Sequence, residues 1–139
     1  LSRARVQDDV RVASLLRKVT SLIVAVCDPE AIILFGSYAK GQANRNSDVD
    51  LLVIGEFPGS PFLRDRELRQ LLHGFPLHID VYLATGTEVA VELAKPFGFM
   101  RSILSSGFLL HSKRPSLDAG QSLEVAFGYR KGIPQSRFV

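Results

Sequence analysis

The sequence predicts a single α/β or α+β domain, in which a small mixed β-sheet packs against helices that lie mainly on one of its faces. Two observations lead to this fold class. Some segments have the three-to-four spacing of apolar residues that is typical of amphipathic helices, and short apolar runs with β-branched residues lie between them. The chain is also long enough, at 139 residues, to bury one core of ordinary size.

The first two predicted elements are a long helix and a short strand. Residues 6–26 predict an amphipathic helix that ends before Pro29, because a proline disfavours helical backbone in the residue that precedes it. Ala31–Phe35 is entirely apolar and predicts a strand that leads into Gly36. The apolar stripe of the helix consists of Val12, Leu15, Leu16, Val19, Leu22, Ile23 and Val26.

The middle of the chain predicts a second strand and a second helix. A polar segment, residues 40–47, precedes the strand Val49–Ile54, which is apolar apart from Asp50. Ser60 and Pro61 are typical of the N-cap and the first turn of a helix. Gly74 is a suitable residue to end that helix, because glycine readily adopts the backbone conformations found at helix C-termini.

The third strand is predicted by a strict alternation of apolar and polar residues over positions 77–83. Alternation of this kind points one set of side chains toward a core and the other set toward the opposite face. The apolar set is Ile79, Val81 and Leu83, and the polar set is His78, Asp80 and Tyr82.

Two short helices are predicted after the third strand. Thr85 and Glu88 have the spacing of a capping box and predict a helix that Pro96 interrupts. Residues 97–106 predict a further helix that Gly107 stops.

The last predicted element is a short edge strand at residues 108–111. We therefore expect the folded domain to span residues 1–112. Residues 113–139 form a polar C-terminal tail with several glycines and prolines, and no periodicity in it predicts a structure.

The composition excludes several classes of protein. Charged residues make up 22% and apolar residues 46%, which excludes a globally disordered chain. The formal charge of +3 is spread along the chain without a run of five like charges, so nucleic-acid binding is unsupported. No apolar stretch approaches the roughly 20 residues that span a bilayer, and we expect no membrane insertion. Cys27 is the only cysteine, which excludes an internal disulfide and favours a reducing, cytoplasmic location.

A pair of carboxylates stands at the start of the second predicted strand. Strand geometry points Asp48 and Asp50 to the same face, about 6.6 Å apart along the chain. Asp80 would join them if its strand is the neighbour, at about 4.8 Å. Carboxylates this close repel one another strongly, so either some are protonated or a cation lies among them. Ligands that are oxygen only point to Mg²⁺, or to Mn²⁺, rather than to zinc.

A Gly-Ser turn precedes these carboxylates by ten residues. Gly36 permits a positive φ or a close approach of backbone, and Ser37 adds a hydroxyl and a backbone N–H. If residues 38–40 begin a helix, its N-terminal dipole favours an anion there. Lys40 and Arg45 either neutralise further phosphate charge or are solvated loop charges. A phosphate-binding turn beside metal-binding carboxylates suits phosphoryl or nucleotidyl transfer.

This arrangement resembles the nucleotidyltransferase domain of the DNA polymerase β superfamily, over roughly residues 12–112. Among its members, the short chain is most similar to the minimal nucleotidyltransferases, which are commonly antitoxins paired with HEPN-type ribonuclease toxins. The matching motif consists of Gly36 and Ser37, ten further residues, Asp48 and Asp50, and then Asp80 on a later strand.

The resemblance implies a role for each part of the motif. The Gly-Ser turn would hold the phosphates of a nucleotide, and the first two carboxylates would bind Mg²⁺ in both metal positions. Asp80 would ligate the catalytic metal and serve as the general base, or help to position it. Lys40 stands where the family often has arginine, so the charge is kept but bidentate geometry is lost.

The resemblance also implies ATP as substrate and transfer of AMP to a hydroxyl of a partner protein, a HEPN-type toxin. Two alternatives stay open. The protein could neutralise its toxin by contact alone, without catalysis. It could also modify a small molecule such as an aminoglycoside, although such enzymes usually have an additional helical domain and only 27 residues follow Ser112. The sequence leaves the oligomeric state open, a homo-oligomer included.

Other residues near the motif have simpler interpretations. His78 and Tyr82 share a face with Asp80 and could line the cleft, but we expect both to be partly buried sheet residues. Three later aromatic residues are expected in the core rather than on a surface that stacks a base: Phe97, Phe99 and Phe108.

Overall fold

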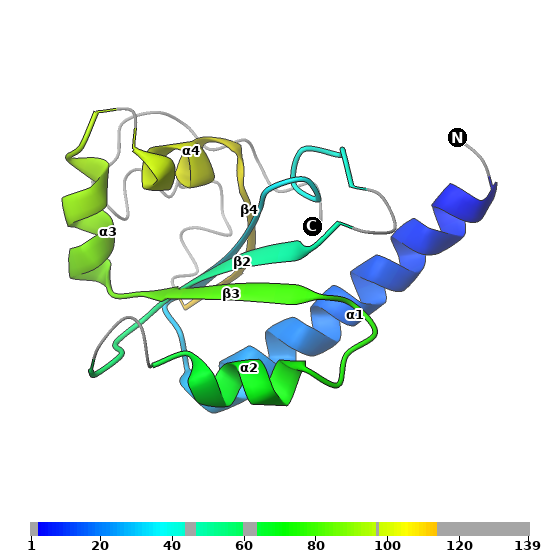
Figure 1. Ribbon diagram of the computed structural model, residues 1–139, viewed down its shortest axis with the longest axis horizontal. Coiled ribbons are helices and arrows are strands. Elements are labelled where there is room, and N and C mark those ends of the chain that lie inside the picture. The colour runs from blue at the N-terminus through cyan, green and yellow to red at the C-terminus, as the bar shows by residue number, and fades with distance from the viewer. Residues whose placement is uncertain (1–2, 44–46, 60–63, 97, 114–139) are drawn as a thin grey trace.

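The computed structural model describes residues 3–43, 47–59, 64–96 and 98–113. Within these residues four strands form one sheet in the order β3-β2-β1-β4. β2 and β3 are parallel, whereas β1 is antiparallel to both β2 and β4 (Figure 1). The strands are β1 (Ala31–Phe35), β2 (Val49–Ile54), β3 (Ile79–Ala84) and β4 (Phe108–Ser112). The predicted small mixed sheet of an α+β fold is confirmed, and so is the edge strand.

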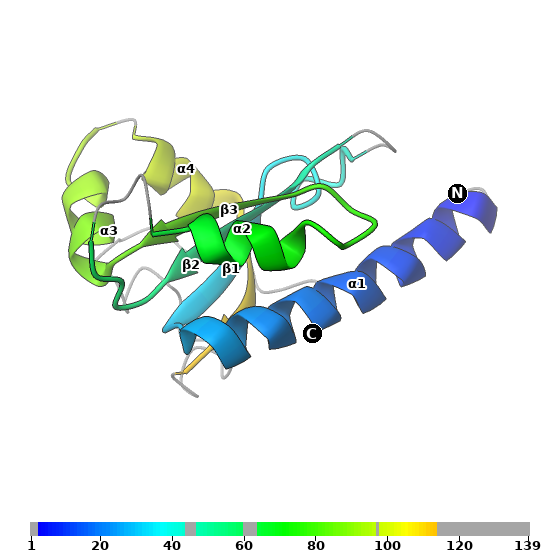
Figure 2. The ribbon, with the colours of Figure 1, turned by 60° about the horizontal axis from the view of Figure 1, so that its bottom comes forward.

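Four helices accompany the sheet in the described part of the chain, and they cover both of its faces (Figure 2). Side chains of α1 and α2 pack against one face, and those of α3 and α4 against the other. The expectation of helices mainly on one face therefore needs correction. All five side chains of β1 are apolar and buried, and they point alternately to the two faces, so each face needs a cover. The helices are α1 (Arg3–Cys27), α2 (Arg66–Leu72), α3 (Gly86–Leu93) and α4 (Phe99–Ser106).

The long helix α1 packs on the sheet only along part of its length, and its N-terminal end extends beyond the sheet (Figures 1 and 2). Leu16, Val19 and Ile23 lie on the predicted apolar stripe and are buried, whereas Val10 and Val26 are exposed. Among the described helices, this one included, none combines the length and the apolar character needed to cross a membrane.

The second helix begins later than predicted. α2 starts at Arg66, after Asp65, whose carboxylate pairs with Arg69 one turn further on at 2.7 Å. The predicted start at Ser60 and Pro61 is therefore wrong, and these two residues lie outside the described part of the chain. Serine and proline are suited to helix starts locally, but several positions in this segment compete for that role. The predicted tail also lies outside the described residues, except for its first residue.

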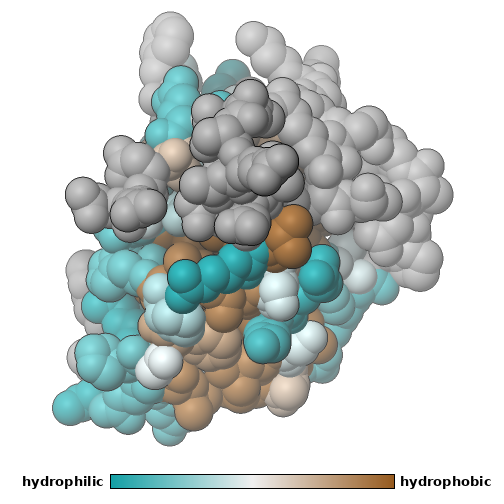
Figure 3. All heavy atoms as spheres, turned by 90° about the vertical axis from the view of Figure 1, so that its right-hand side faces the viewer, coloured by the Kyte–Doolittle hydropathy of each residue, from teal (hydrophilic) through white to brown (hydrophobic). Residues whose placement is uncertain are grey.

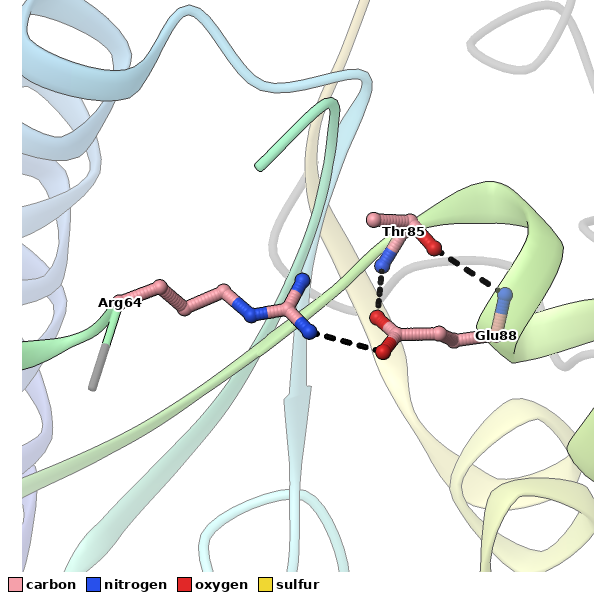
Figure 4. Close-up of polar contacts among 3 residues, drawn as sticks. All are labelled: Arg64, Thr85 and Glu88. Carbon is pink, nitrogen blue, oxygen red and sulfur yellow. Dashed lines mark hydrogen bonds and ion pairs between the residues drawn. The ribbon is translucent and has the colours of Figure 1, made fainter. Parts of the chain in front are cut away.

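The capping box at the start of α3 is confirmed. The Glu88 backbone N–H donates to Thr85 Oγ1 at 3.1 Å, and the Thr85 N–H donates to Glu88 Oε1 at 2.8 Å. Arg64 Nη2 also donates to Glu88 Oε2 at 2.7 Å, and the Arg64 side chain is only 5% exposed (Figure 4). This ion pair joins the segment before α2 to the first turn of α3.

The Glu88 interactions predict a pH-dependent contribution to stability. The pKa of Glu88 is lowered, first by the hydrogen bond from Arg64 and next by the backbone hydrogen bond of Thr85. Because its pKa is lower in the folded state, ionised Glu88 stabilises the fold at pH values above the ordinary glutamate pKa of about 4.3. This stabilisation is lost as the pH falls through the pKa of the folded state. We expect Glu88→Gln to lower the urea midpoint at pH 7, and the gap from the unsubstituted protein to shrink by pH 3.

The matched control for this experiment is Glu92→Gln. Glu92 forms an exposed ion pair with Lys95 on the same helix, so its substitution should change the midpoint little at either pH. A gap for the Glu88 variant that is independent of pH would contradict the prediction.

Candidate active site

The two parallel strands β2 and β3 begin at the same end of the sheet (Figure 1). In their register Asp50 lies opposite Asp80, and the pair before it is Val49 with Ile79. Parallel strands in register hold equivalent residues side by side at the strand spacing of about 4.8 Å. Asp80 was expected to join the other two carboxylates if its strand is the neighbour of theirs. The pairing of β2 with β3 meets this condition.

The tightest group of polar side chains at this end includes a histidine. His78 Nδ1 lies 2.7 Å from Asp48 Oδ1 and 4.0 Å from Asp80 Oδ2. One ligand atom from each of these three residues lies within 4.8 Å of the others. His78 is 70% exposed, so the expectation of a partly buried sheet residue is wrong. The alternation over residues 77–83 places His78 on the same face as Asp80. That pattern was sufficient to predict His78 as a residue of the site.

Asp50 lies beside this group with its carboxylate against the backbone of Gly36. A Cβ atom on Gly36 would overlap Asp50 Oδ2 and would lie 3.3 Å from Cγ. Gly36 also has a φ of +77°, which favours glycine. Both properties expected of this glycine, a positive φ and a close approach, occur together. Because Gly36 has no side chain, the Asp50 carboxylate can lie against the backbone at this position.

Burial and the neighbouring negative charges both affect the pKa of Asp50. Its pKa is raised, first by burial and then by the negative charges of Asp80 and Asp48, while His78 opposes the shift. A bound cation would relieve this repulsion and favour the ionised carboxylate.

The chain after Gly36 forms turns and not a helix. The Lys40 N–H donates to the Gly36 carbonyl at 3.1 Å, and the Gln42 N–H donates to the Ser37 carbonyl at 2.9 Å. The helix considered for residues 38–40 is therefore absent, and no helix dipole acts there. Ser37 is partly exposed in this turn. Arg45 lies outside the described residues.

A cavity of about 210 Å³ adjoins Asp50 on the sheet face that α4 covers. Gly36 and Lys40 line it from the turn, and Tyr82 lines it from β3. Figure 3 shows the molecule from the end at which β2 and β3 begin, with apolar surface in brown in the lower half of the view beside hydrophilic residues in teal. Gly36 of the Gly-Ser turn, the positively charged Lys40 side chain and the Asp50 carboxylate therefore line one cavity.

The cavity also exposes an aromatic residue that was expected in the core. Phe99 is 63% exposed at the start of α4, because the buried stripe of that helix consists of Met100, Ile103 and Leu104 and leaves its side chain outside. Phe108, by contrast, is 3% exposed and lies in the core as expected. Phe97 lies outside the described residues.

The donor atoms at this end of the sheet fit a divalent cation. Asp48, Asp50 and Asp80 offer carboxylate oxygens, which Mg²⁺ and Mn²⁺ prefer. His78 Nδ1 lies at hydrogen-bond distance from Asp48 Oδ1, and hydrogen bonds of this kind orient carboxylate ligands. The pKa of Asp50 is raised first by burial and only then by the negative charges of Asp80 and Asp48, and a cation bound here would offset that repulsion.

Comparison with known proteins identifies the family. Residues 15–107 match the family model of the nucleotidyltransferase domain. The chain belongs to this nucleotidyltransferase family. The matched range contains the Gly-Ser turn, all three carboxylates and α4, so the cavity and the polar group lie within the family domain. No curated protein matches the chain at a significant level.

Among the similar solved structures, one shows the same fold at a TM-score above 0.5. A candidate nucleotidyltransferase from Sulfolobus solfataricus aligns over 81% of this chain and 91% of its own, with 16% identity and a TM-score of 0.58. A toxin–antitoxin structure with AMP-PNP aligns over 82% and 90%, with 20% identity and a TM-score of 0.45. A mutant of the toxin–antitoxin MntA–HpeT aligns over 84% and 89%, with 17% identity and a TM-score of 0.41. The nucleotidyltransferase fold expected from the motif is confirmed, whereas the roles of individual residues stay predictions.

The contact between Gly36 and Asp50 predicts the effect of a side chain at this glycine. We expect Gly36→Ala to lower the free energy of unfolding by about 1–2 kcal/mol for the positive φ, and to displace the Asp50 carboxylate that the new Cβ would overlap. It should also weaken Mn²⁺ binding, because the carboxylate must move. Urea denaturation and electron paramagnetic resonance of Mn²⁺ measure the two effects.

Gly41→Ala is the matched control. Gly41 has a φ of +71°, and no atom lies within 4 Å of the position that a Cβ would take there, so its substitution reports backbone strain without overlap. Equal losses of stability and unchanged Mn²⁺ binding in both variants would contradict the role assigned to the contact.

Proposed function

We propose that this nucleotidyltransferase uses Mg²⁺ and transfers AMP from ATP to a hydroxyl of a partner protein, a HEPN-type toxin. The observation that supports catalysis best is the strand register that sets Asp50 opposite Asp80. Asp48 lies two residues before Asp50, and Gly36, which has no side chain, lies against the Asp50 carboxylate. Carboxylates for a cation and a turn for phosphate thus meet at one end of the sheet.

The nucleotide would bind with its phosphates at the Gly-Ser turn. Backbone N–H groups and the Ser37 hydroxyl are suited to phosphate oxygens, and Gly36 allows them to approach closely. Lys40 lines the same cavity and supplies positive charge. Arg45 is the second cation that we assign to the phosphates.

The carboxylates would have separate tasks. Asp48 and Asp50 would hold Mg²⁺ in both metal positions, and Asp80 would join them at the catalytic one. Bound Mg²⁺ neutralises charge that develops on the phosphates during transfer. Asp80 is 37% exposed, within reach of an incoming hydroxyl, and would accept its proton or help to position the group that does.

The bond changes are those of an in-line displacement. The acceptor oxygen forms a bond to the α-phosphorus of ATP, and the bond from that phosphorus to the pyrophosphate breaks. His78 would keep Asp48 oriented through its 2.7 Å contact, so we assign it a positioning role.

The partner is proposed from the resemblance of the motif to minimal nucleotidyltransferases. A domain of this size has little surface for selecting an acceptor, so the acceptor would supply much of the recognition. A cytoplasmic location is part of the proposal, because ATP, Mg²⁺ and reduced cysteine occur together there.

The proposal predicts metal-dependent labelling of the partner. We expect [α-³²P]ATP and Mg²⁺ to label a copurified HEPN-type toxin, and EDTA to abolish the labelling. Asp48→Asn or Asp50→Asn should lower the rate at least about 100-fold, because each removes a charged ligand, while the complex with the toxin persists. Asp28→Asn is the control, since Asp28 pairs with Lys113 and lies outside the site.

The outcomes distinguish AMP transfer to the toxin from neutralisation of the toxin by binding alone. If the variants with asparagine protect cells from the toxin as well as the unsubstituted protein does, the protein acts by binding alone. Folded protein that binds ATP and transfers no AMP to its toxin would refute the proposed reaction.

A further inference from the structure

Two large aromatic side chains are exposed beside the carboxylates. Tyr82 on β3 is 45% exposed and Phe99 on α4 is 63% exposed. Both rings contact Phe35 of β1, which is only 6% exposed. The ring centroids lie 5.5 Å apart for Phe35 and Tyr82, and 5.7 Å apart for Phe35 and Phe99. Phe35, Tyr82 and Phe99, named here the aromatic platform, thus form one apolar surface from three elements.

The aromatic platform lines the same cavity as the phosphate-binding turn. Gly36, Lys40 and Asp50 line that cavity together with all three rings. A molecule whose phosphates lie at the Gly-Ser turn therefore has its remaining part within reach of the aromatic platform. Phosphates alone make no use of such a surface, whereas the flat ring of a nucleobase can stack on it.

Polar groups at the edge of the cavity complete its lining. Ser102 and Ser106 reach it from α4. The Ser106 hydroxyl donates to the Ser102 carbonyl at 2.8 Å, so its oxygen remains able to accept a hydrogen bond from a ligand. The cavity thus has aromatic and polar lining side by side, a combination that suits a small molecule with both a flat ring and charged groups.

The acceptor has a separate approach to the site. Asp48 and His78 are exposed and Asp80 is partly exposed, and none of these three residues lines the cavity. A hydroxyl of a partner protein can reach Asp80 from that open side. The cavity side is then available to the base of the nucleotide.

We propose that the aromatic platform stacks the nucleobase of the donor nucleotide, with Tyr82 and Phe99 as the contacting rings and Phe35 as their support. This inference rests on the proposed function, in which the ligand is a nucleotide, and adds the residues that bind its base. Tyr82 and Phe99 thereby distinguish a nucleotide from bare polyphosphate, which the turn and the carboxylates alone do not.

The first experiment compares ATP with inorganic tripolyphosphate, which has the phosphates without the base and ribose. Isothermal titration calorimetry with Mg²⁺ measures both. We expect Phe99→Ala to weaken ATP binding about 10-fold or more and to leave tripolyphosphate binding unchanged. Tyr82→Leu should act in the same direction. Val91→Ala is the control, because Val91 is 56% exposed on α3 outside the cavity, and it should change neither affinity.

The second experiment uses the absence of tryptophan from the sequence. Phe99→Trp introduces a single tryptophan on the aromatic platform and keeps an aromatic face there. Its fluorescence should change on titration with ATP and stay constant with tripolyphosphate. This variant keeps the test decisive if Phe99→Ala fails to fold.

The proposal is overturned if Phe99→Ala leaves ATP affinity unchanged, if it weakens ATP and tripolyphosphate equally, or if the unsubstituted protein binds neither. Both experiments contain no acceptor protein. If the aromatic platform discriminates ATP from tripolyphosphate and no AMP is transferred, the proposed function fails and this inference stands.

Discussion

Two like charges stand side by side at the start of β2 and β3, because the strands pair in parallel with Asp50 opposite Asp80. At 4 Å such a pair costs about 4 kcal/mol in an environment of intermediate polarity. The following residues of the same strands offset this cost. Leu51, Val53 and Val81 are nearly or fully buried, and each contributes about 1.5–3 kcal/mol. The apolar pairing is therefore strong enough to hold the carboxylates together, ready for a cation.

One face of the sheet packs against α1 and α2 in a hydrophobic core, and the other face carries the cavity beside Asp50. Val49, Leu51 and Val53 point to the face of α1 and α2 and form a dry core there. Asp50 points to the other face, where α4 stands opposite and bounds the cavity. Asp48, His78 and Asp80 lie at the end of the sheet and stay partly exposed, so their charges are not buried in either core. A glycine at position 36 then makes room for the one carboxylate that turns inward.

Local chemistry explains why most elements could be predicted. β1 is a uniform apolar run, β2 is apolar apart from Asp50, and the observed strands have the predicted limits. The capping box of Thr85 and Glu88 is a contact within four residues and needs no other part of the chain. The start of α2 was predicted wrongly because Ser60 and Pro61 are only locally suitable, and the observed start at Arg66 has its own pair of charges.

The sequence by itself determined the elements, the spacing of the Gly-Ser turn and the carboxylates, and the family that these residues resemble. Each of these depends on neighbours along the chain, where period and spacing are directly visible. Only the tertiary structure decided that helices cover both faces, that His78 contacts Asp48, and that Phe99 faces the cavity. These features depend on which residues from distant segments meet in space, and a one-residue change in register or helix rotation would reverse them.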